Sequence, residues 1–139
     1  MAEKNLKIEI ITPQSVVFSG DAISVNVPGS LSPFEVLYNH APIVSSLEYG
    51  IIKIKLTNNK ELFYATNSGF IEVKQNVVSI LVEQAVDSQS IKANQVIATI
   101  DNLKNEINLT KSDSEKQILI DKLGYEQAKL KVSNLMSKN

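Results

Sequence analysis

The sequence has no cysteine and no arginine among its 139 residues, and it has a single histidine. Without cysteine there is no disulfide, no thiol nucleophile and no thiolate metal site. All 14 basic residues are lysine, so no guanidinium group is available to hold a phosphate through two fixed hydrogen bonds. One histidine is too few for a histidine-based metal site.

A long apolar run and an excess of either charge are also missing. No stretch approaches the ~20 apolar residues that cross a bilayer, and MAEKNLKIEI lacks the apolar core of a signal peptide. Lysines nearly balance acidic residues, and the net charge is -1. We therefore expect an intracellular protein, soluble or peripherally bound to an assembly, with no nucleic-acid partner and no direct membrane insertion.

Motifs of known enzyme classes are missing as well. There is no glycine-rich phosphate loop with its lysine, no GxSxG motif, no HExxH motif and no dinucleotide fingerprint. Acidic residues are scattered singly, and Asp21, Glu72 and Glu83 are expected to face solvent from strands. We predict a protein that is not an enzyme, with no catalytic, metal-binding or cofactor-binding residues.

The single histidine, His40, lies in the stretch VLYNHAPIV. A general base needs a nucleophile and an orienting group, and the sequence identifies neither. Asn39 tolerates a left-handed backbone, while Pro42 fixes its own φ and restricts the residue before it. The stretch is therefore interpreted as a shaped turn before a strand, in which His40 has a structural or interface role.

The two halves of the sequence differ in hydrophobic period. Residues 1–86 contain short apolar–polar alternations rich in β-branched residues, which favour an antiparallel sandwich or barrel. The expected strands are Leu6–Thr12, Ala22–Val27, Ile51–Thr57, Glu61–Thr66, Phe70–Val73 and Val77–Gln84. Residues 87–139 have apolar residues at three- and four-residue steps, which predicts helices. The fold class is therefore α+β, with domains 1–86 and 87–139.

The helical half divides into two segments. The first helix is predicted by one apolar stripe, formed by Ala93, Val96, Ile97, Ile100, Leu103 and Ile107. The pattern breaks over Asn108–Ser112, where Ser112 and Glu115 fit a capping box, and a second helix is expected from Asp113 to Met136. Within it, Gly124 costs ~1 kcal/mol relative to alanine, so it marks close packing, a bend or a tolerated defect.

The second helix has two apolar lines. One contains Leu119, Leu123 and Leu130; the other contains Ile118, Tyr125, Ala128, Val132 and Met136. A two-helix hairpin needs only one apolar stripe on each helix. The second line therefore packs either on the strand domain or on another protein, and the pattern alone does not decide between them.

The sequence around His40 resembles the epsilon subunit of F-type ATP synthases, which is called delta in mitochondria. VLYNHAPIV is similar to the family's GILPGHAPLL-like segment, and ITPQSVVFSGDAISVNVPGS is similar to TPEG-x-VFSGE followed by V-x-V-x-G. Further on, Gly50–Ile54 resembles P-G-v-v-r-I, and Gly69–Val73 with Asn76–Val78 and Leu81 resembles GFLEV…N-x-V-x-v-L. The likeness in motifs covers about residues 8–86, and the helical half is similar in architecture.

The resemblance implies a ten-stranded β-sandwich followed by an antiparallel two-helix hairpin. It implies a rotor subunit that links the gamma subunit to the c-ring, couples rotation to ATP synthesis and has no catalytic residue. It would contact gamma, the c-ring, and in some states alpha and beta, peripherally on the cytoplasmic face of a bacterial inner membrane. The alternative is a stand-alone β-sandwich module that recognises a partner through its helices.

The resemblance also implies roles for particular residues. In the family a glycine-rich, often acidic loop before the histidine faces the c-ring. The matching positions here are Leu31, Ser32, Pro33, Phe34, Glu35 and His40. The loop is more apolar than in the family, so we expect contact through Leu31 and Phe34. Glu35 replaces a glycine, so we expect a shifted backbone there.

The helical half departs from the family's nucleotide-binding members. Those members have Asp and Arg where this sequence has Lys92 and Gln95, so the resemblance implies no specific ATP binding and no cofactor. Basic residues of the family's second helix face the beta subunit and inhibit ATP hydrolysis. The residues that match by region are Lys116, Lys122, Lys129 and Lys131. A solvated lysine face is the alternative interpretation.

Overall fold

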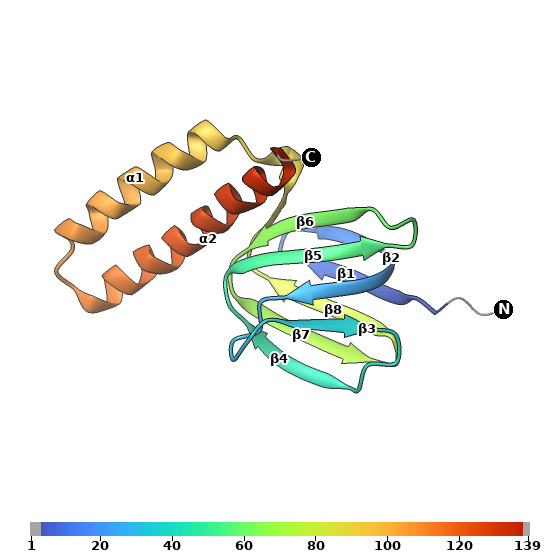
Figure 1. Ribbon diagram of the computed structural model, residues 1–139. Helices are drawn as coiled ribbons and strands as arrows, with labels where there is room; N and C mark the ends of the chain where they lie inside the picture. Colours follow the sequence, from blue (N-terminus) through green and yellow to red (C-terminus); the bar gives the residue numbers. More distant parts are fainter. Residues whose placement is uncertain (1–3, 138–139) are drawn as a thin grey trace.

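The computed structural model describes residues 4–137, except for the side chains of Met136 and Ser137. Strands come first and helices last (Figure 1), in the order that the two hydrophobic periods predict. The elements are β1 (Leu6–Ile11), β2 (Val16–Val27), β3 (Phe34–Leu37), β4 (Ile43–Leu47), β5 (Gly50–Leu56), β6 (Glu61–Thr66), β7 (Gly69–Lys74), β8 (Val77–Val82), β9 (Ala85–Asp87), the short 3-10 helix η1 (Ser88–Ser90), α1 (Ala93–Leu109) and α2 (Asp113–Ser137).

The strands form one connected sheet that folds over itself into two layers (Figure 1). Neighbouring strands follow the order β4-β7-β8-β1-β2-β5-β6-β9, and β3 pairs with β2. A bridge between Gly29 and Leu47 joins the residues after β2 to the edge strand β4. This bridge closes one corner of the sandwich.

The prediction of ten strands is wrong, because residues 4–137 contain nine. Val16–Val27 is one continuous strand that pairs with β1 along its first half and with β3 and β5 along its second. An irregularity between Ala22 and Ser24 shifts its register with β5, and such a bulge bends a strand without ending it. The strand β1 also pairs in parallel with β8, which the expectation of an antiparallel sheet did not include.

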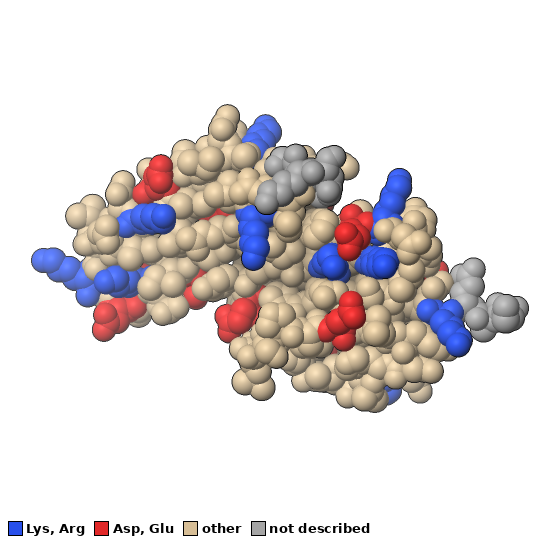
Figure 2. Space-filling view, viewed as in Figure 1, with Lys and Arg blue, Asp and Glu red and all other residues tan. Residues whose placement is uncertain are grey.

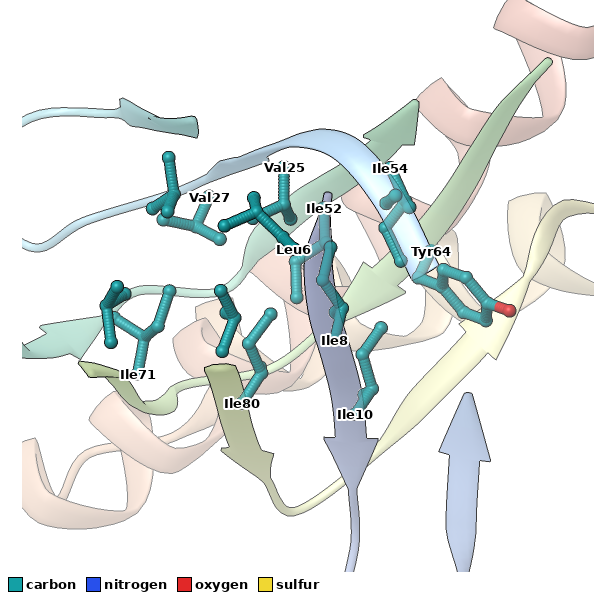
Figure 3. Close-up of a cluster of buried hydrophobic side chains, with 14 of the residues drawn as sticks. Leu6, Ile8, Ile10, Val25, Val27, Ile52, Ile54, Tyr64, Ile71 and Ile80 are labelled. Atoms are coloured by element: carbon teal, nitrogen blue, oxygen red, sulfur yellow. The ribbon is translucent and has the colours of Figure 1, made fainter. Parts of the chain in front are cut away.

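The sandwich core is formed by the inward residues of both layers (Figure 3). Ile52 and Ile54 of β5 are fully buried, as the alternation with lysine predicted. In Figure 3, Val25 and Val27 of β2 point toward Ile71 and Ile80, with the β1 residues between the layers. Each such buried side chain contributes ~1.5–3 kcal/mol relative to exposure, so this cluster fixes the positions of the loops around it.

The second apolar line of α2 packs on the sandwich. Tyr125, Ala128 and Val132 are buried in one cluster with Ala65 of β6. For these three residues the structure therefore supports packing on the strand domain and not contact with another protein. Ile118 of the same line is 56% exposed, and the side chain of Met136 lies outside the described residues.

Gly124 allows α2 to approach the turn between β4 and β5. A Cβ at this position would lie 2.3 Å from Cε2 of Tyr49. Of the three explanations for this glycine, close packing is the one that the structure supports. The predicted start of α2 is confirmed, since the Glu115 backbone N–H donates to Ser112 Oγ at 3.4 Å.

Candidate interaction surfaces

The segment 29–35 follows β2 and runs into the first two residues of β3, and it includes residues expected to face the c-ring. Leu31 is 104% exposed, whereas Phe34 is partly buried against the sandwich core. Gly29 lies close to this ring, because a Cβ there would be 2.8 Å from Phe34 Cε1. Glu35 lies in β3 opposite Asn26, in extended backbone. The two apolar residues thus differ, and Leu31 is the one that faces solvent.

His40 ends a tight turn between β3 and β4. Its backbone N–H donates to the Leu37 carbonyl at 3.0 Å, and Asn39 has a left-handed φ of 65°, the conformation that an asparagine tolerates there. The imidazole stacks on Phe34 with ring centroids 6.5 Å apart. Its Nδ1 lies 2.7 Å from the Ala41 carbonyl. These contacts support the structural interpretation of the histidine.

A surface that the sequence motifs do not identify lies on the outer face of β7, β8 and β1. Phe70 is 59% exposed and Leu81 is 48% exposed. They face each other across β7 and β8, and Leu81 in turn pairs with Ile11 of β1. We call Phe70, Leu81 and Ile11 the apolar strip. Two exposed apolar side chains thus lie in register beside the partly buried Ile11, and exposed apolar groups of this kind can mark a protein contact surface.

The apolar strip borders a hollow of about 780 Å³. Its walls combine apolar side chains with hydroxyl groups and two carboxylates. The polar wall residues are Thr12, Ser30, Ser46, Glu48, Ser68 and Glu83. Ser46 and Ser30 are joined by a 2.8 Å hydrogen bond between their hydroxyl groups. A partner's apolar side chain could therefore enter this hollow while polar groups bind its backbone.

A sequence signal for the apolar strip does exist. Ile71 and Ile80 point into the core, so the alternation predicts polar residues at Phe70 and Leu81. Strands with apolar residues on both faces are typical of sheets covered on both sides. Here α2 covers the β5 and β6 side, and the strip on β7 and β8 is exposed. A second covering layer is thus implied by the residues themselves.

The four candidate lysines of α2 have different environments. Lys122 and Lys131 are exposed and Lys116 is partly exposed. Lys129 is already engaged: its Nζ lies 2.7 Å from Glu126 Oε2 and 4.5 Å from the centroid of the Tyr125 ring. On the face in Figure 2, blue and red side chains both occur along the hairpin, and several blue ones lie together at its far end, at the left of the view.

Tyr125 packs α2 against β6, and Lys129 lies over its ring. It is 7% exposed, and burial raises the pKa of its phenol to about 12, with a smaller contribution from the Glu126 carboxylate. The neutral phenol is thus favoured at every pH below that value. The packing of α2 on β6 therefore involves an uncharged side chain under physiological conditions.

Lys92 and Gln95 lie where the start of α1 meets the second half of α2. They line a hollow of about 280 Å³ together with Thr99, Glu126 and Lys129. The Glu126 carboxylate neutralises Lys129 in this wall. The remaining charge in this wall is that of Lys92. Its ammonium group is a point charge and cannot hold a phosphate through two fixed hydrogen bonds as a guanidinium group does.

Residues 4–137 offer neither a membrane-spanning helix nor a metal-binding cluster. No helix there is long and apolar enough to cross a membrane. No group of three or more His, Asp or Glu side chains in the same range is placed to hold a metal ion. The candidate site consists of three surfaces: the segment 29–40, the apolar strip and the exposed lysines of α2.

The chain is similar to known ATP synthase proteins in sequence. The beta-sandwich domain of the ATP synthase delta/epsilon chain matches residues 5–88. The "ATP synthase epsilon chain" of Nitratiruptor sp. is 36% identical over 112 residues, which are 81% of this chain and 84% of that one. The protein of the same name from Magnetococcus marinus is 33% identical over 124 residues, which are 88% and 90% of the two chains.

Two solved structures share the fold. A chain in the Euglena gracilis mitochondrial ATP synthase, a structure of OSCP, F1 and c-ring, has a TM-score of 0.80 at 15% identity and matches 91% of this chain and 79% of its own length. A chain in the Tetrahymena thermophila central stalk and c-ring has a TM-score of 0.68 at 15% identity, covering 94% and 97%. At this identity the likeness establishes architecture, including the order of sandwich and helices.

The family model spans most of the sandwich, from before β1 to the start of η1. The two bacterial relatives extend the match into the helices at more than 30% identity. The nine-stranded sandwich and the two helices docked on it agree with both comparisons. This chain therefore belongs to the delta/epsilon chain family of ATP synthases.

Proposed function

We propose that the chain is a rotor subunit of an F-type ATP synthase, which links the gamma subunit to the c-ring without catalytic residues of its own. The observation that supports this most directly is the apolar strip beside the hollow at one end of the sandwich. A stand-alone module using its helices would leave this strip uncovered, while one face of α2 already packs on the sandwich. Family membership and the strip together favour the rotor assignment.

The apolar strip is the proposed contact for gamma. Its exposed aromatic and aliphatic side chains resemble the buried centre of a stable protein interface, and the hydroxyl groups around the hollow resemble its polar rim. The segment 29–35 with His40 is the proposed contact for the c-ring. Two separate surfaces on one rigid sandwich would allow the subunit to hold both partners at a fixed distance.

The gamma contact is tested with Phe70→Asp and Leu81→Asp chains. Each substitution places a carboxylate in the centre of the proposed interface, and loss of such a residue typically costs about 1–3 kcal/mol of binding. Purified gamma should therefore bind roughly 5- to 150-fold more weakly by surface plasmon resonance. Ile97→Asp is the matched control, because Ile97 is 45% exposed on α1, away from the strip.

Co-purification provides the broader test of the rotor assignment. Tagged wild-type chain should isolate gamma and the c-ring together with the catalytic head. Isolation of neither gamma nor the ring would contradict the assignment. Retention of gamma by the Phe70→Asp chain at wild-type affinity would instead place the gamma contact elsewhere on the same protein.

The two helices are proposed to act as an antiparallel hairpin with a regulatory role on the beta subunit. Lys116, Lys122 and Lys131 remain candidates for contact with acidic residues of beta. Exposed ion pairs contribute only ~0–1 kcal/mol each, so several must act together. The ATPase rate of the catalytic head, with and without the chain, measures this inhibition.

The proposed domains of the chain are residues 1–86 and residues 87–139. The proposed location of the subunit is the cytoplasmic side of a bacterial inner membrane.

Specific ATP binding is not expected for the isolated chain. The hollow at Lys92 and Gln95 offers one uncompensated lysine, and the Glu126 carboxylate in its wall repels a triphosphate. Isothermal calorimetry with Mg·ATP at physiological salt should give no saturable heat in the micromolar range. Saturable micromolar binding would refute this expectation, and a Lys92→Ala chain would then locate it.

A further inference from the structure

The turn between β7 and β8 contains two left-handed residues. Gln75 has a φ of 50° and Asn76 has a φ of 64°. Two successive residues with positive φ are typical of the tight hairpin turns whose twist matches antiparallel strands. Asparagine tolerates this conformation, so a turn role alone would explain its presence. The side chain of Asn76, however, makes contacts that the turn itself does not require.

Asn76 joins three segments that are distant in the sequence. Its Oδ1 accepts a hydrogen bond from the backbone N–H of Asn39 at 2.7 Å, and its Nδ2 donates to Asn39 Oδ1 at 3.4 Å. Its backbone carbonyl accepts from the Lys7 N–H at 2.9 Å. The turn before His40 is thereby tied to the β7–β8 turn and to the start of the central strand β1.

Asn76 accepts a hydrogen bond from the Asn39 N–H, a donor that the His40 turn's own hydrogen bond does not use. The turn's own hydrogen bond uses the His40 N–H and the Leu37 carbonyl, so the Asn39 N–H needs a partner from outside. The left-handed backbone of Asn39 sets the direction in which the chain enters His40. In that direction the imidazole ring of His40 stacks on the ring of Phe34. The orientation of this turn is therefore set from the other layer of the sandwich, through Asn76.

We propose that Asn76 is a positioning residue for c-ring contact: it holds the turn of Asn39 and His40, and through the His40–Phe34 stack the segment before it, in the orientation that meets the ring. The inference rests on the proposed function. Asn76 does not touch the ring itself. It acts by keeping the turn of Asn39 and His40 rigid, so that this turn does not move when torque is transmitted between the partners.

Asn76→Gly tests the inference without disturbing the turn, because glycine adopts positive φ readily. It removes the side chain with its amide, and the added backbone freedom of glycine is matched by the control below. Asn76→Asp keeps an acceptor for the Asn39 N–H and is the conservative variant. Asn59→Gly is the matched control: Asn59 has a φ of 70° in the β5–β6 turn, which does not contact the His40 turn.

Two readouts are measured on the full chain. Amide hydrogen exchange by NMR should show the Asn39 N–H exchanging roughly three- to tenfold faster in Asn76→Gly, the change expected from one hydrogen bond. Affinity for purified c-ring–gamma complex should fall by a similar factor, while affinity for gamma alone stays at the wild-type value. Asn76→Asp and Asn59→Gly should match the wild type in both readouts.

Faster exchange with unchanged affinity for the c-ring–gamma complex would overturn the positioning role and leave Asn76 as a structural residue only. An equal loss of affinity in Asn59→Gly would overturn it too, because general turn rigidity would then be the cause. A wild-type chain that binds gamma but gains nothing from the ring would overturn the proposed ring contact itself. The wild-type measurement thus separates failure of the inference from failure of the proposed function.

Discussion

Gly124→Ala is expected to loosen the docking of α2 on the sandwich. In an isolated helix this substitution stabilises by ~1 kcal/mol. Here the new methyl group would lie 2.3 Å from the Tyr49 ring, and overpacking of this kind costs typically about 1–3 kcal/mol. We expect the steric term to win, so that the amides of residues 125–132 exchange faster by mass spectrometry while the sandwich strands stay protected.

The sign of the effect makes this prediction informative. The Tyr49→Ala background is the control, because it removes the ring that the methyl group meets. In that background Gly124→Ala should stabilise α2, as helix propensity requires, and the double-mutant cycle should show a favourable coupling. Slower exchange for Gly124→Ala in the wild-type background would contradict the prediction, since it would mean that Tyr49 rotates away at no cost.

Leu31→Asp and Phe34→Asp are expected to weaken c-ring contact for different reasons. Leu31 is 104% exposed, so its replacement should leave the unfolding free energy within ~0.5 kcal/mol of the wild type. If it is buried by the ring, affinity should fall about 10- to 100-fold. Phe34 packs on the core and on His40, so Phe34→Asp should destabilise the fold by about 2–4 kcal/mol.

Urea unfolding and binding to the c-ring–gamma complex together separate the two effects. Leu109→Asp is the matched control, because Leu109 is 81% exposed at the far end of the hairpin. It should change neither measurement. Unchanged ring affinity of a stable Leu31→Asp chain would show that this loop does not make the contact. A Phe34→Asp chain as stable as the wild type would contradict the packing role of the ring.

Local patterns predicted most of the elements and their inward faces. The alternation in β5 placed Ile52 and Ile54 in the core, and the break before Ser112 placed the start of α2. Asp21 and Glu72 face solvent from strands as expected, while Glu83 is exposed but follows the end of β8. These features depend on neighbours within a few residues, where strand and helix periods act directly.

Features that depend on distant residues were not predictable in this way. The Asn39–Asn76 pair joins residues 37 apart, and the approach of Gly124 to Tyr49 spans the two halves of the chain. The expected strand began at Ala22, whereas β2 begins at Val16, because pairing with β1 extends it through Gly20 and Asp21. Leu31 and Phe34 were both expected to contact a partner, and the packing of Phe34 on the core and on His40 separates them.

The position of β1 has a consequence for biosynthesis. Leu6, Ile8 and Ile10 belong to β1, which leaves the ribosome before the other described strands, yet β1 lies in the middle of the sheet between β2 and β8. Its parallel partner is synthesised some seventy residues later, and such long-range pairing slows folding. Until Val77–Val82 emerges, the nascent chain exposes an apolar strand with one unpaired edge. Translation pauses after β8 should thus favour correct folding more than pauses before it, and chaperones should bind the chain chiefly in that interval.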